Sequence, residues 1–159
     1  MTEFETDLDR VRGRLVVRGG FDVDRARVWQ LLTSAEDLPH WLGRPEGLPS
    51  RMGARFRIRH DEQTVSTHRV TRWRPYRLLG WSWELPDEDD SSVTFTITPV
   101  AAGSVLTVQH LGLADLPACA AGWWLHLDRL GAHVRGEPRA DTCWSEHAVL
   151  ADRFRRETR

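Results

Sequence analysis

The sequence contains no lysine and no asparagine, so arginine supplies all 22 of its basic residues. Its 23 acidic residues leave a formal net charge of −1. A chain balanced in this way creates no field of one sign that would attract nucleic acid or anionic lipid. We attribute the arginine bias to codon usage in a GC-rich genome. The composition argues against nucleic-acid and membrane partners.

Long apolar runs and cysteine motifs are missing as well. No stretch approaches the roughly 20 apolar residues of a membrane span, and the first residues lack the pattern of a secretory signal. The two cysteines, Cys119 and Cys143, form no CxxC motif and are too few for a structural zinc site. We expect free thiols, a cytoplasmic location, and neither a metal nor another cofactor.

Short segments of alternating polarity dominate the middle of the chain. Phe56 and Ile58, for example, alternate with arginines, the pattern of a sheet with one face in water. Short connections between the segments predict an antiparallel meander. Together with a first strand, the meander gives about six strands, with expected bounds of 14–21, 54–60, 64–73, 77–85, 92–99 and 104–111.

Helices are expected on either side of the meander. Asp22 is a suitable N-cap for a helix that ends near Thr33, and a second short helix follows at 34–42. Residues 1–11 are polar and predicted to be loose, whereas 44–52 and 112–120 are predicted loops. The final long helix carries one apolar stripe on positions spaced four, three and four apart: Trp123, Leu127, Leu130 and Val134.

This order of elements, a strand, two short helices, a meander and a long last helix, is typical of the helix-grip fold. The segments that carry the likeness are 21–33, 38–41, 53–56, 93–97, 103–108 and 122–123. Together they resemble the bacterial homologues of the heat-shock-protein-90 ATPase activator, in the START-like (SRPBCC) superfamily. The resemblance implies an α+β fold in which a curved antiparallel sheet wraps around the C-terminal helix and encloses a cavity.

We expect one domain over residues 1–159, with its core at about 14–135. Residues 136–159 form an extension, predicted to be a short helix or arm. This extension, around Trp144, and the edges of the sheet are candidate surfaces for a homodimer.

The inward face of the sheet is rich in aromatic side chains, which pack a core or line a ligand pocket. With the pocket that the resemblance implies, the candidate ligand-binding residues are Trp41, Met52, Phe56, Ile58, His68, Trp81, Trp83, Phe95, His110, Trp123 and Leu127. As ordinary core, the same residues need no ligand.

Three inward histidines invite a chemical role. In the expected hairpin Phe56 faces His68, which puts His60 about 13 Å along the sheet from His68, too far to share a metal ion. A neutral imidazole can still act as a general base. His68 and His110 are therefore the candidate catalytic residues, and no metal site is expected.

Three functions remain open. The leading one is binding of a small apolar or aromatic molecule between the sheet and the last helix. The first alternative is an enzyme of the same fold, such as a cyclase, dehydratase or hydrolase, that uses an inward histidine. The second is a chaperone-associated interaction module, which the absence of the eukaryotic activator's asparagine-rich N-terminal signature makes less favoured.

Overall fold

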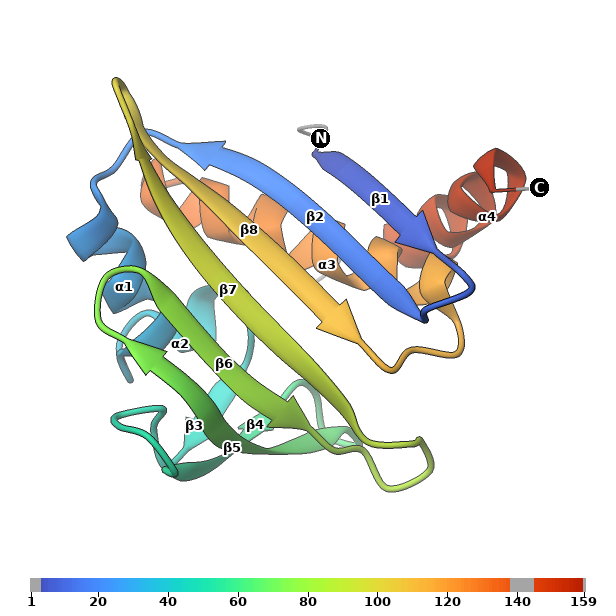
Figure 1. The fold of residues 1–159 in the computed structure, drawn as a ribbon, viewed down its shortest axis with the longest axis horizontal. Helices are drawn as coiled ribbons and strands as arrows, with labels where there is room; N and C mark the ends of the chain where they lie inside the picture. Colours follow the sequence, from blue (N-terminus) through green and yellow to red (C-terminus); the bar gives the residue numbers. More distant parts are fainter. Residues whose placement is uncertain (1–3, 138–144, 159) are drawn as a thin grey trace.

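In a computed structural model, which describes residues 4–137 and 145–158, the chain forms one antiparallel sheet and four helices (Figure 1). The strands are β1 (Glu5–Asp9), β2 (Arg14–Phe21), β3 (Arg44–Glu46), β4 (Arg55–Arg59), β5 (Val65–Arg74), β6 (Leu78–Trp83), β7 (Ser91–Val100) and β8 (Gly103–Leu111). The helices are α1 (Arg25–Thr33), α2 (Leu38–Trp41), α3 (Leu116–Val134) and α4 (His147–Glu157).

The sheet has the order β1-β2-β8-β7-β6-β5-β4-β3, with neighbouring strands antiparallel. Strands β4 to β8 form the expected meander, and β2 returns to pair with β8. In the β4–β5 hairpin Phe56 lies opposite His68 and Ile58 opposite Ser66. The register predicted for this hairpin is therefore confirmed.

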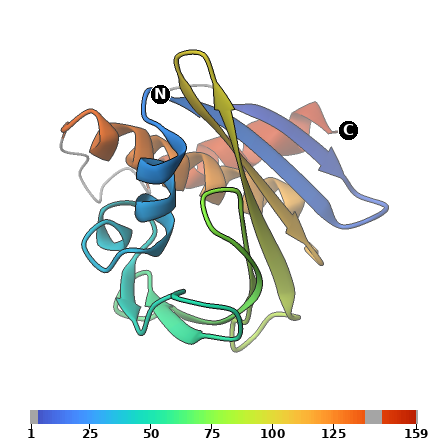
Figure 2. The same cartoon turned by 60° about the vertical axis from the view of Figure 1, so that its left-hand side comes forward.

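The long helix α3 lies across the concave side of the sheet, behind β2 and β8 in Figure 1. Trp123, Leu127 and Leu130 are buried against the sheet, as their helical spacing predicts. In Figure 2 the strands β3 to β6 curve round below α1 and α2. Burial of these apolar faces is the main force that holds the two layers together.

The sheet has eight strands rather than about six, because two polar edge segments also pair. Residues 5–9, expected to be loose, form β1, where Glu5 lies opposite Arg18 and their side chains form an ion pair at 3.1 Å. The predicted loop at 44–52 contributes β3, in which Pro45 lies on the outermost strand, a position that tolerates proline. Neither segment has the apolar alternation that predicts a strand.

Three helix starts also differ from the prediction. Helix α2, expected from residue 34, begins at Leu38, after a turn at 35–37. The N-cap of α1 is Asp24 rather than Asp22, and its carboxylate accepts a hydrogen bond from the backbone of Arg27 at 2.8 Å. Helix α3 begins at Leu116, within the segment predicted to be a loop, because Asp115 caps it and Pro117 fits its first turn.

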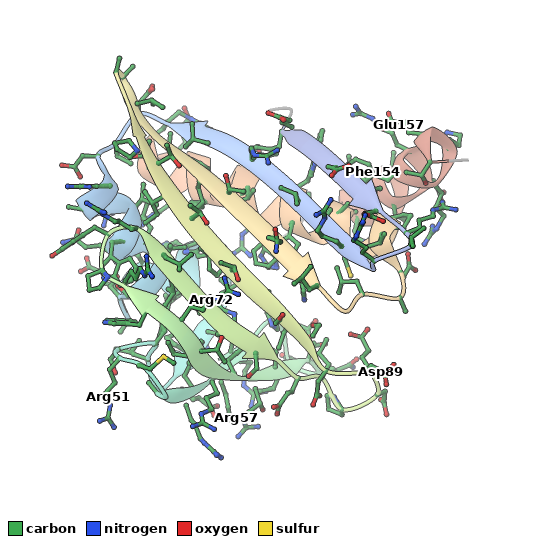
Figure 3. All side chains as sticks on the ribbon, viewed as in Figure 1. Arg51, Arg57, Arg72, Asp89, Phe154 and Glu157 are labelled. Carbon is green, nitrogen blue, oxygen red and sulfur yellow. The ribbon has the colours of Figure 1, made fainter. Side chains whose placement is uncertain are left out.

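The outer face of the sheet is polar, and the C-terminal extension contributes an apolar helix face to the core. Arg57 points away from the molecule in Figure 3, as the alternation in β4 predicts. The extension contains α4, which packs on α3 through Phe154 and Trp124, with ring centroids 5.2 Å apart. Cys143 and Trp144 lie outside the described residues.

Candidate functional site

A pocket of about 1030 Å³ lies alongside α3, on the side where the sheet curls towards the helix. Its walls come from α2, the start of β3, the end of β4 and the turn after it, the end of β6, α3 and α4. The lining residues are Pro39, His40, Gly43, Arg44, Arg59, His60, Asp61, Glu62, Thr64, Trp83, Leu85, Gly122, His126, Arg129 and His147. The volume is at the upper end of the usual range for small-molecule sites.

Helix α3 supplies one long wall of the pocket. Gly122, His126 and Arg129 line it at positions i, i+4 and i+7, which lie on one face of a helix. This face is next to the apolar stripe that Trp123 and Leu127 present to the core. A side chain on Gly122 would meet no atom within 4 Å of its first carbon, so this glycine leaves the pocket open.

The opposite wall is aromatic. Trp83, at the end of β6, stacks on the ring of His60 with centroids 5.6 Å apart and planes at 26°. Leu85 and Pro39 add further apolar surface. An aromatic ligand would find both a flat partner and apolar neighbours here.

Charged groups also line the pocket. Arg44, Arg59 and Arg129 are cationic, and Asp61 and Glu62 are anionic. Arg59 lies 3.8 Å from Glu46, and the carboxylate of Asp61 accepts hydrogen bonds from the backbone of its own turn. The pocket thus combines an aromatic wall with a mixed charged rim.

Behind Trp83 three side chains form a continuous chain of close polar contacts. His60 Nε2 lies 2.7 Å from Ser66 Oγ, and that oxygen lies 2.6 Å from His68 Nε2. The outer nitrogens contact backbone carbonyls, since His60 Nδ1 is 3.2 Å from Leu42 O and His68 Nδ1 is 2.8 Å from Ser82 O. His60 is the member of this chain that also lines the pocket.

Burial favours the neutral form of His60, His68 and His126, because it penalises the charged form. It lowers the pKa of His60, lowers the pKa of His68 to about 4 and lowers the pKa of His126 to about 3. His126 also gives its Nδ1 hydrogen to the carbonyl of Trp41 at 2.9 Å. Neutral imidazoles at a pocket wall can accept protons from a ligand.

His110 has different surroundings. The indole of Trp123 donates to its Nδ1 at 3.1 Å, so the imidazole hydrogen is on Nε2, which lies 2.7 Å from Ser91 Oγ. Burial lowers the pKa of His110 to about 3. His110 is outside the pocket lining and links α3 to the sheet.

The family model described as "Activator of Hsp90 ATPase homolog 1-like protein" matches residues 22–135, more than half of the chain. The chain belongs to this family. The match coincides with the region from α1 to α3, which contains almost the whole pocket.

Solved structures show the same fold. CalU16 from Micromonospora echinospora is 24% identical, with a TM-score of 0.78, and the alignment covers 96% of this chain and 93% of that one. DynU16, a protein of the dynemicin biosynthetic locus, is 21% identical with a TM-score of 0.74, covering 81% of this chain and 50% of its own. MLL2253 from Mesorhizobium loti is 25% identical with a TM-score of 0.71, covering 77% and 96%. No curated protein matched.

The structure places most of the predicted ligand-binding residues in the core rather than at the pocket. Trp83 alone of that set lines the pocket. The rings of Phe56, His68, Trp81, Phe95, His110 and Trp123 pack against one another or against Trp83, with neighbouring centroids between 4.7 and 6.1 Å apart. Ile58 and Leu127 are fully buried in the same core.

Two further residues expected near the mouth are elsewhere. Trp41 is fully buried and donates its indole hydrogen to the carbonyl of Leu31 at 2.7 Å. Met52 is 61% exposed in the segment between β3 and β4. Alternation identifies the inward face of a strand, but it does not tell which inward side chains the helix covers.

The expected separation of His60 and His68 was wrong for their rings. Their backbone positions follow the predicted register, but the two side chains extend towards Ser66 and bring both Nε2 atoms within 2.7 Å of its hydroxyl oxygen. Still, no group of three or more histidine, cysteine or acidic side chains in the described residues is placed to hold a metal ion.

Sequence reasoning missed Gly122, His126 and Arg129 as pocket residues. The signal was available, since all three lie on one helical face beside the apolar stripe.

Cys119 lies in the first turn of α3, where burial raises the pKa of its thiol to about 12, so it is a poor nucleophile.

Within the described residues, no helix has the length and apolar character to cross a membrane.

Proposed function

We propose that the protein binds a small hydrophobic or aromatic molecule in the pocket between the sheet and α3. The observation that carries this proposal is the pocket of about 1030 Å³ that runs along Gly122, His126 and Arg129 and faces Trp83. The core beneath Trp123 is filled with side chains, so the ligand would lie beside the core and not within it. The family membership supports the proposal through the shared fold.

Tryptophan fluorescence tests the proposal directly, because Trp83 forms part of the wall. Titration with naphthalene derivatives should quench the emission, and native mass spectrometry of the freshly purified protein should show a bound small molecule. A Trp83→Phe variant should lose most of the quenching, whereas a Trp29→Phe variant, changed at a buried ring that packs on Trp73 away from the pocket, should retain it. Absence of quenching by every apolar probe would contradict the proposal.

An enzyme of the same fold is the second candidate. The observation that favours it is the pair of neutral imidazoles, His60 and His126, which both line the pocket as neighbours with ring centroids 6.0 Å apart. Of the two histidines singled out from the sequence, His68 would act through Ser66 and His60, and His110 would act only on the packing of α3. Mass analysis of a bound aromatic ligand before and after incubation tests this, with His60→Gln expected to stop any conversion.

The chaperone-associated role stays a prediction that follows from the family's description. Its test is the ATP hydrolysis rate of a bacterial heat-shock ATPase with and without the protein. An unchanged rate would remove this role.

A further inference from the structure

The chain from His60 to His68 is one hydrogen short. A carbonyl oxygen only accepts, so the Leu42 and Ser82 carbonyls fix the imidazole hydrogens of His60 and His68 on their Nδ1 atoms. Both Nε2 atoms are then acceptors, and both face Ser66 Oγ. Two imidazole hydrogens and one hydroxyl hydrogen serve four contacts, so one contact lacks its hydrogen.

His110 provides the comparison within the same molecule. Trp123 donates to its Nδ1, its Nε2 donates to Ser91 Oγ, and the Ser91 hydroxyl points to the carbonyl of Trp83 at 3.4 Å. Three hydrogens serve three contacts there. The shortage is therefore a property of the His60–Ser66–His68 chain and not of buried histidines in this fold generally.

One added proton completes the chain. With a second hydrogen on the Nε2 of either imidazole, that nitrogen donates to Ser66 Oγ, and the hydroxyl donates to the other Nε2. All four contacts then have a hydrogen, and the three side chains together carry one positive charge. Buried polar groups are satisfied in almost every native structure, which favours this state wherever its charge is balanced.

The charges around the chain decide when that proton is held. Asp61, in the turn next to His60, favours the added proton, and Glu62 of the same turn also lines the pocket. The guanidinium groups of Arg44, Arg59 and Arg129 line the same pocket and oppose the added proton, and the imidazoles of His40, His126 and His147 line it as well. On the core side, His110 faces His68 across Trp83. Burial lowers the pKa of His60 and His68, so the chain is neutral when the pocket holds no anion.

On the basis of the proposed binding function, we infer that the ligand is an aromatic acid, which binds as its oxyanion against His60 and Trp83 while the His60–Ser66–His68 chain takes up one proton. The ring lies on the aromatic wall, and the negative charge lies beside the buried imidazole that borders the pocket. In low-dielectric surroundings this attraction is much stronger than in water. A neutral aromatic molecule of the same shape gains nothing from the proton.

The proton balance is simple. A carboxylic acid is already ionised at neutral pH, so the chain takes its proton from the buffer and no bond in the ligand changes. A phenol arrives with its proton, which moves to the chain, and no net exchange with the buffer occurs. A carboxylate is therefore the better probe, because its binding leaves a countable proton.

Calorimetry at pH 7.5 in two buffers of different ionisation enthalpy tests the inference, with 2-naphthoate and its neutral analogue 2-naphthamide as probes. Naphthoate should take up about one proton per molecule bound and lose affinity by about tenfold per pH unit as the pH rises. Naphthamide should take up none. Ser66→Ala should remove the uptake, and the matched control Ser91→Ala, next to the complete His110 contacts, should leave it intact.

Nitrogen NMR of the unmodified protein gives an independent measurement, so the test does not depend on the variants folding. Saturation with naphthoate should move the Nε2 signal of His60 or His68 to the protonated position and leave His110 unchanged. If both probes bind without proton uptake, the inference is overturned and the binding function stands. If neither binds, both are overturned. Proton uptake that survives Ser66→Ala also contradicts the inference.

Discussion

Trp123 on α3 donates its indole hydrogen to Nδ1 of His110 on β8 at 3.1 Å, in a region where both side chains are buried. This bond joins the long helix to the sheet at the centre of the core. It also fixes which nitrogen of His110 carries the hydrogen, and so directs the contact with Ser91. A histidine that resembles a catalytic base in the sequence thus serves to dock the helix.

Trp123→Phe should destabilise the protein without changing ligand affinity by more than about twofold. The smaller ring leaves a cavity, and the Nδ1 of His110 loses its donor, an unmade buried bond that costs about 1–3 kcal/mol. We expect a total loss of about 3 kcal/mol in urea unfolding, since replacing a large buried ring adds a cavity cost.

Trp124→Phe is the matched control for this prediction. Trp124 is equally buried, but its indole donates to the hydroxyl of Thr6, which is only partly buried and also contacts the carbonyl of Phe4. Trp124→Phe should therefore lower the free energy of unfolding by about 1 kcal/mol less than Trp123→Phe does, because water can replace a partner near the surface. Equal losses in the two variants would argue against a special role for the bond to His110.

Gly122 offers a way to close the pocket without damaging the core. Gly122→Ala should raise the free energy of unfolding by about 0.5–1 kcal/mol, because glycine is unfavourable inside a helix and the added carbon meets open space. Gly122→Phe should fill the pocket and weaken binding of a naphthalene probe by at least about tenfold, that is, by about 1.4 kcal/mol. Fluorescence titration measures the affinity.

Gly131→Ala is the control for Gly122, since Gly131 lies further along α3 and outside the pocket lining. It should leave probe affinity unchanged. Full binding by Gly122→Phe would show that the ligand lies elsewhere.

The sequence was sufficient for the frame of the fold but not for the pocket. Short turns and strict alternation specify how β4 pairs with β5, which is why Phe56 could be placed opposite His68. The contact of both histidines with Ser66 depends on how far side chains extend along the sheet, which residue spacing does not encode. Edge strand β1 was missed because it pairs with β2 through backbone bonds while its five residues carry one apolar side chain, Leu8, and so show no apolar alternation.

Buried histidines should make the fold sensitive to mild acid. Burial lowers the pKa of His110 and His126 to about 3, whereas in the unfolded chain both take up protons as the pH falls below about 6.5. The unfolded state then binds more protons, so stability is lost as the pH falls from 6.5 towards 3. From pH 7.5 to 5.5 these two residues should cost about 1.4 kcal/mol each.

Urea unfolding at pH 7.5, 6.5 and 5.5 measures this dependence. His126→Gln keeps an amide hydrogen for the Trp41 carbonyl but cannot titrate. Between pH 7.5 and 5.5 the variant should therefore lose less free energy of unfolding than the unchanged protein, by the contribution of one histidine. A free energy of unfolding that is the same at pH 7.5 and 5.5 would contradict neutral burial of these histidines.

Asp37 should be the most sensitive ion-pair residue, because it connects three helices. Its carboxylate accepts from Arg27 at 2.8 and 2.9 Å, from Ser34 at 2.7 Å and from His133 of α3 at 2.8 Å. Burial alone would raise the pKa of Asp37, but these partners hold it well below its ordinary value. Its stabilising contribution is therefore complete above about pH 4 and lost below it.

Asp37→Asn should cost about 2–3 kcal/mol at pH 7, a value reduced from that of a fully buried pair because Arg27 is partly exposed. Pro39 and His40 line the pocket just after this position, so looser packing of α2 should also weaken probe binding. Asp152→Asn, which breaks an exposed pair with Arg155, should cost less than about 0.5 kcal/mol. If thermal and urea unfolding gave similar losses for the two variants, Asp37 would be an ordinary surface charge and the three helices would be held by apolar packing alone.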